Sequence, residues 1–113
     1  MEANKTKELI KSAIDAETES AKKNWGENYH SEHEAYAVLT EEIEETNEAF
    51  VKIASIQRVL WNFVRKAKKD DKDIKYLKDN LHYLQDYAQE LATEAVQIAA
   101  VAQKYIDTIG GAK

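Results

Sequence analysis

The sequence predicts an all-α protein on three observations. The chain of 113 residues contains no proline and only three glycines, two of which, Gly110 and Gly111, stand near its C-terminal end. Helix interiors exclude both residue types. Alanine, glutamate, lysine and leucine, which favour helices, are abundant, and apolar residues recur at the spacing of one helix face. A chain of this length suffices for one modest core, so we expect residues 1–113 to form a single domain.

The composition excludes several classes of protein. Because the chain has no cysteine, disulfides and thiolate chemistry are excluded. A net charge of −5 gives no electrostatic reason to bind nucleic acid. No apolar run approaches the ~20 residues of a membrane span, and the N-terminal region lacks the apolar block of a signal peptide. We therefore expect a cytoplasmic protein with neither a nucleic-acid nor a membrane partner.

Three helices follow one another along the chain. A short N-terminal helix is expected over about residues 6–23, and it ends in NWGENYHS, which is rich in turn formers. Ser31 opens the second helix as a capping box with Glu34, and this helix is expected over about residues 32–69, up to the charged run KKDDKD. The third helix is expected over about residues 72–109, with Gly110 as its C-terminal cap.

The length of the second helix predicts an assembly. About 37 residues would span ~55 Å, whereas a compact globule of this chain length is roughly 35 Å across. The apolar stripe of the helix nevertheless continues, and one short first helix cannot cover it. Either the helix breaks near residues 54–55, or a second copy of the chain buries the rest. Since no breaker residue lies there, we expect a long antiparallel hairpin plus the short N-terminal helix, assembled into a homodimer or homotetramer bundle. The residues that continue the stripe are Phe50, Ile53, Leu60, Trp61 and Val64.

The stretch HEAYAVLTEEIEET, residues 33–46, contains two populations of glutamate. At ~100° per residue, Glu42 falls inside the apolar arc formed by residues such as Tyr36, Leu39 and Ile43, and Glu45 lies on its margin. Glu41 is a neighbour of Glu45 but sits further round the helix. Glu44 and Glu48 point outward. Two of the carboxylates are therefore expected to face the interior.

A third carboxylate borders the apolar stripe of the last helix. Glu94 is flanked by Leu91 and Ile98, and Gln97 follows one turn later. Partly buried carboxylates repel one another, and a hard divalent cation offsets that cost. All-oxygen ligand sets suit Mg²⁺ or Mn²⁺, which can polarise a phosphoryl oxygen and activate water for nucleotide hydrolysis. The structural alternative is that these glutamates pair with lysine or arginine, or line a polar seam.

Two separated segments, HEAYAVLTEEIEE and TEAVQIAAVAQKYI, carry a resemblance. Together they resemble the MazG-like all-α nucleotide pyrophosphohydrolases, especially the short members common in phages and prophages. The match covers roughly residues 29–107. The resemblance implies that an ExxE pair on one helix and an ExxD pair on the next hold Mg²⁺ around a nucleoside triphosphate. It also implies that the products are the nucleoside monophosphate and pyrophosphate, and that the protein is a dimer or tetramer.

By position, Glu42 and Glu45 match the ExxE pair, and Glu41 completes the Glu-Glu-x-x-Glu pattern. Glu94 matches the first acid of the second motif, while Gln97 stands where the family has aspartate. An amide oxygen can ligate a metal but carries no charge, so the site loses one anion. Two functions therefore stay open: a pyrophosphohydrolase, or a non-catalytic helical bundle of phage origin that acts through nucleotide binding or protein contacts.

Four further residues are weaker candidates for contact with the substrate. His33 lies in the first turn of the second helix, and Trp25 and Tyr29 could stack on a base. Lys68, in the basic run RKAKK, could grip triphosphate oxygens. Each has a structural alternative: hydrogen bonding at a helix start, anchoring of a loop, or interaction with a helix dipole. A P-loop is excluded because the sequence has no Gly-rich phosphate motif.

Overall fold

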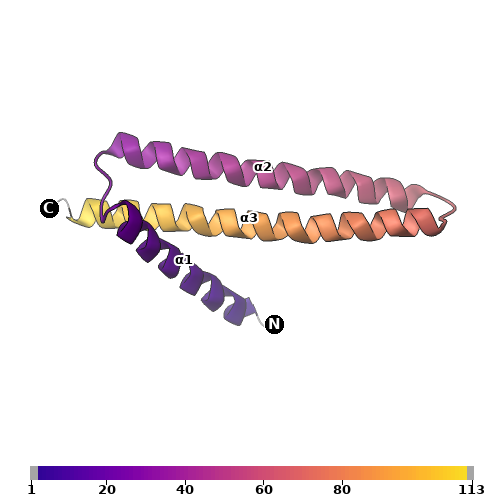
Figure 1. The fold of residues 1–113 in the computed structure, drawn as a ribbon, viewed down its shortest axis with the longest axis horizontal. Helices are drawn as coiled ribbons and strands as arrows, with labels where there is room; N and C mark the ends of the chain where they lie inside the picture. The colour runs from indigo at the N-terminus through magenta and orange to yellow at the C-terminus, as the bar shows by residue number, and fades with distance from the viewer. Residues whose placement is uncertain (1–2, 112–113) are drawn as a thin grey trace. The chain divides into compact units, whose positions relative to one another are not determined.

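The structure is a computed structural model that describes residues 3–111, and within those residues it consists of three α-helices without strands (Figure 1). The helices are α1 (Ala3–Trp25), α2 (Glu32–Arg65) and α3 (Asp71–Gly111). The predicted all-α class is confirmed. Over the described part of the chain, no helix combines the length and the apolar character that crossing a membrane requires.

Gly26 terminates α1 by adopting a backbone conformation that other residues avoid. Its φ angle is +100°, and its N–H donates a 2.9 Å hydrogen bond to the carbonyl oxygen of Lys22. This is the left-handed glycine cap that commonly ends helices. The same role was predicted for Gly110, and that prediction is wrong. α3 runs through Gly110 to Gly111, and Gly26 is the only residue of the described range with a positive φ.

The start of α2 follows the predicted cap with one difference. The Ser31 hydroxyl oxygen accepts a 3.1 Å hydrogen bond from the Glu34 backbone N–H, as expected. The Glu34 carboxylate, however, accepts its backbone hydrogen bond from His30 rather than from Ser31, at 3.1 Å. Its second oxygen lies 3.1 Å from His30 Nδ1. These hydrogen bonds from His30 lower the pKa of Glu34.

The end of α2 corrects the prediction that this helix continues to about residue 69. It ends at Arg65, four residues before the predicted end. Beyond the helix, Lys66 Nζ reaches Asp73 Oδ1 at 2.6 Å. Asp73 and Asp70 then cap α3 reciprocally, each accepting a 2.9 Å hydrogen bond from the backbone N–H of the other.

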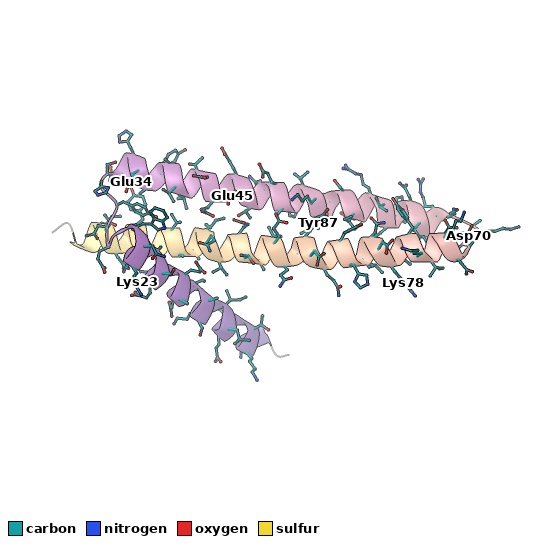
Figure 2. All side chains as sticks on the ribbon, viewed as in Figure 1. Lys23, Glu34, Glu45, Asp70, Lys78 and Tyr87 are labelled. Carbon is teal, nitrogen blue, oxygen red and sulfur yellow. The ribbon has the colours of Figure 1, made fainter. Side chains whose placement is uncertain are left out.

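The chain divides into two compact units. The first unit contains α1, the part of α2 up to Glu44 and the part of α3 from Thr93, and the second contains residues 45–92. α2 and α3 are each continuous through the boundary. Within the second unit, Lys52 Nζ lies 3.4 Å from Glu90 Oε1 and 5.5 Å from the centroid of the Tyr87 ring, a residue labelled on α3 in Figure 2.

The buried line of α2 differs from the apolar stripe predicted for it. Ala35, Ala49 and Ile56 are buried and stand seven residues apart, or twice seven, which is the spacing of a coiled-coil seam. At Ala35 and Ala49, the small side chain lets a neighbouring helix backbone come close. The larger residues predicted to face inward therefore lie beside this line. α2 is also unbroken at residues 54–55, as predicted. The exposed members of the predicted stripe are Tyr36, Ile43, Phe50, Trp61 and Val64.

Candidate metal centre

Glu42 lies on the buried line of α2, where a surface glutamate is not expected. It follows Ala35 by seven residues and precedes Ala49 by seven, and both alanines are 0% exposed. The side chain of Glu42 is accordingly half-buried, and its Oε2 atom is buried. Glu44 and Glu48 are exposed. The predicted division of the α2 glutamates into inward-facing and outward-facing side chains is confirmed.

Glu42 and Glu94 belong to the first unit, and one carboxylate oxygen of each lies within 4.8 Å of the other. Glu45 stands one turn after Glu42 on the continuous helix α2, where Figure 2 labels it, and its oxygen lies within the same distance of that of Glu42. All three side chains are half-buried. The structure therefore brings together three of the five residues predicted to ligate a metal.

This spacing has an electrostatic consequence. Two like charges at such a distance repel by on the order of a few kcal/mol at an effective dielectric constant of about 20. A shared cation turns that repulsion into attraction. Around octahedral Mg²⁺, ligand oxygens lie about 2.9 Å or 4.2 Å apart, since each is 2.0–2.1 Å from the ion.

The structure does not bring Glu41 into this group, because its side chain is exposed. Gln97 makes a contact that the sequence did not predict: its Nε2 donates a 2.9 Å hydrogen bond to Glu17 Oε2. Both side chains are half-buried, and α1 therefore contributes a carboxylate beside position 97. The sequence gives one indication that Glu17 faces inward, since it shares the inner face of the first helix with Ile14 and Ala21.

Tyr29 anchors the connection between α1 and α2 to the last part of α3. Its backbone N–H donates a 3.0 Å hydrogen bond to the Thr108 hydroxyl. Its ring packs edge-on against Tyr105, with 6.4 Å between centroids, and Lys104 Nζ lies 4.3 Å from the Tyr29 centroid. Burial, followed by the nearby carboxylates of Glu34 and Glu42, raises the pKa of Tyr29. These contacts favour the anchoring role of Tyr29 over stacking on a base.

The remaining candidates for substrate contact are at the surface. Trp25 is 79% exposed at the end of α1, and His33 is exposed in the first turn of α2. Lys68 is exposed and lies in the connection after α2 rather than in a helix. Their roles toward a substrate stay predictions.

Three half-buried glutamates on an all-α scaffold define a candidate centre for a hard divalent cation. Comparison of the chain with protein-family models, with curated proteins and with solved structures finds no match. The function is therefore inferred from the residues of the site and from the chemistry that they permit.

Proposed function

We propose that this protein is a metal-dependent nucleoside triphosphate pyrophosphohydrolase related to the MazG-like enzymes. The observation that carries the proposal is the convergence of Glu42, Glu45 and Glu94. These are the positions at which the sequence resembles the acidic motifs of that family. A scaffold protein gains nothing from three half-buried carboxylates at this spacing, whereas a magnesium-dependent hydrolase requires them.

In the proposed reaction, Glu42, Glu45 and Glu94 would hold one Mg²⁺ or Mn²⁺, an ion that suits all-oxygen ligands and substrate phosphates. When bound, the ion polarises a phosphoryl oxygen and lowers the pKa of a water. A carboxylate oxygen that does not ligate the ion accepts a proton from the attacking water. The water oxygen then bonds to the α-phosphorus, the bond from this phosphorus to the bridging oxygen breaks, and pyrophosphate leaves with the bonding electrons.

One observation favours the alternative, a relative that binds nucleotides without hydrolysing them. The amide nitrogen of Gln97 is turned to Glu17, so position 97 supplies hydrogen-bond donation where the family has an anion. A site with fewer anionic ligands holds Mg²⁺ more weakly. In that case the protein would act through nucleotide binding or protein contacts.

The test is the reaction itself. A panel of nucleoside triphosphates with Mg²⁺ should yield pyrophosphate and the monophosphate, measured by anion-exchange chromatography. Glu94→Gln should lower the rate by about a hundredfold or more, because it removes a metal ligand, while Glu48→Gln should leave the rate unchanged. Release of inorganic phosphate would indicate a different reaction. Nucleotide binding without turnover by the native chain would establish the alternative.

We further propose that α2 and α3 form a long antiparallel hairpin and that the chain assembles as a homodimer or homotetramer. The support is a row of large exposed apolar side chains on one face of α2. At ~100° per residue, Tyr36, Ile43, Phe50 and Trp61 fall within an arc of about 40°, and all four are exposed. A row of large exposed apolar side chains of this kind indicates an interaction surface.

Substitutions at two adjacent residues of α2 test the assembly. Phe50 and Val51 are 59% and 61% exposed, but Val51 lies outside the apolar arc. Phe50→Glu should convert the oligomer to a monomer at micromolar concentration, because it places a charge inside an apolar interface. Val51→Glu should leave the oligomer intact. Sedimentation velocity measures both, and a native chain that sediments as a monomer would refute the proposal.

A further inference from the structure

The charged residues of α2 are separated by sign along the helix. Residues 32–48 contain seven glutamates and no lysine or arginine. Residues 49–65 contain three basic residues and no acidic one, and residues 66–69, beyond the helix, add three lysines. The acidic segment (residues 32–48) and the basic segment (residues 49–69) each carry two members of the exposed apolar row of α2, which consists of Tyr36, Ile43, Phe50 and Trp61.

The helix dipole does not account for this separation of charge. Its influence falls off within the first and last turn of a helix. Glu44 and Glu48, however, lie at least roughly three turns after the start of α2, and Arg58 lies about two turns before its end. Over residues 3–111, none of these three side chains forms an ion pair. Their charges are therefore available to a partner.

The position of these charges beside the apolar row predicts an orientation for two paired copies. At ~100° per residue, Glu44 and Arg58 lie about 100° and 60° from the middle of the row, on the same side of it. Two identical helices that pair in antiparallel orientation about a two-fold axis bring the same sides of their rows together. The acidic segment of each copy then meets the basic segment of the other. A parallel pair would instead place each segment beside its own counterpart, where like charges repel.

We propose that two copies of the chain pair through the apolar row of α2 in antiparallel orientation, with the acidic segment of each copy against the basic segment of the other. That the copies associate at all rests on the homodimer or homotetramer of the proposed function, whereas their orientation rests on the charges. Burial of the apolar side chains favours both orientations, because the hydrophobic effect is non-directional. The charges discriminate between the two, since they attract in one orientation and repel in the other.

The orientation can be measured because the chain contains no cysteine, so that one introduced cysteine accepts one spin label. His33→Cys and Val51→Cys place a nitroxide at exposed positions on the same side of the row, near the start of the acidic segment and near the boundary of the two segments. Double electron–electron resonance measures the distance between the labels of two copies. In the antiparallel pair, labels at position 51 should lie within about 30 Å of each other, and labels at position 33 about 45–60 Å apart. Equal distances at the two positions would overturn the orientation.

Charge reversal tests the same orientation at the residues that predict it. Glu44→Lys and Arg58→Glu each replace attraction by repulsion at two symmetry-related places. Each variant alone should therefore dissociate about tenfold more readily than the native chain. An equal mixture of the two variants should form mixed pairs with near-native affinity, because opposite charges face each other again.

Glu41→Lys is the matched control for these reversals. Glu41 is exposed on the far side of α2 from the apolar row, so this variant should dissociate as the native chain does. Sedimentation velocity over a concentration series measures every sample. A native chain that stays monomeric would overturn the assembly and the orientation together. A native dimer whose two reversed variants do not recover affinity on mixing would overturn the orientation alone.

Discussion

Substitution of Glu42 by glutamine is expected to abolish most of the stabilisation that Mg²⁺ or Mn²⁺ confers on the folded protein. A ligand that binds only the folded state stabilises it by about 2.7 kcal/mol at 100 times its dissociation constant. A variant that binds a hundredfold more weakly would keep about 0.4 kcal/mol at the same metal concentration. For a chain of this size, the difference corresponds to a change in melting temperature of several degrees or more, roughly 4 °C per kcal/mol.

The same substitution should have the opposite effect without metal. Glu42 lies among carboxylates whose oxygens are within 4.8 Å of one another, so a neutral amide removes like-charge repulsion. The metal-free Glu42→Gln variant should therefore melt at a higher temperature than the native chain. A glutamate held by a cationic partner would show the reverse, because glutamine would break an ion pair. The sign in EDTA thus distinguishes a metal ligand from a structural glutamate.

Glu48→Gln is the matched control. It lies on the same helix and makes the same chemical change, but its side chain is exposed. Differential scanning fluorimetry across a Mg²⁺ titration should give Glu48→Gln the native response. Equal responses of the two variants would show that the direction in which a glutamate of α2 faces does not determine whether it binds the metal.

The fold was predictable from the sequence because its signals are local. The absence of proline and the scarcity of glycine in the interior of the chain favour long helices. Ser31 marks the start of α2, and its capping partner Glu34 stands only three residues later. The premature end of α2 at Arg65 was missed because no glycine or proline marks it. The feature that accompanies the helix end is the ion pair of Lys66 with Asp73, which joins residues on the two sides of the connection to α3.

The inward facing of Glu42 and Glu45 was also predictable, since it follows from helical periodicity within one segment. The sequence did not predict which face of α2 packs within one chain. A row of bulky apolar residues, such as Phe50 and Trp61, has the same pattern whether it faces a core or a second copy. The buried line instead passes through Ala35 and Ala49. An analysis of apolar periodicity gives such small residues no special importance. The contact between Glu17 and Gln97 was beyond prediction, because no local pattern relates residues 80 positions apart.

That contact makes position 97 the second site at which a large effect is expected. Gln97→Asp introduces the anion that stands at this position in the MazG-like family. It also removes the amide that donates a 2.9 Å hydrogen bond to Glu17 and places a like charge beside that carboxylate. In EDTA, the variant should lose about 1.5–3 kcal/mol of stability, the cost of removing a hydrogen bond to a half-buried charge. In Mg²⁺ it should regain more stability than the native chain does, because the site has gained an anionic ligand.

The double variant Glu17→Gln/Gln97→Asp distinguishes the two effects of Gln97→Asp. It exchanges the amide and the carboxylate, so an amide at position 17 can donate to the new aspartate while the total charge stays native. Stability in EDTA, measured by urea denaturation, should return toward the native value, giving a coupling energy of about 1 kcal/mol or more in the double-mutant cycle. The response to Mg²⁺ should remain above native, since the anion now stands one turn after Glu94 on α3. If the two substitutions act additively, the Glu17–Gln97 hydrogen bond does not contribute to stability. If the double variant responds to Mg²⁺ no more than the native chain, position 97 lies outside the metal centre, and the glutamate group must bind its cation without it.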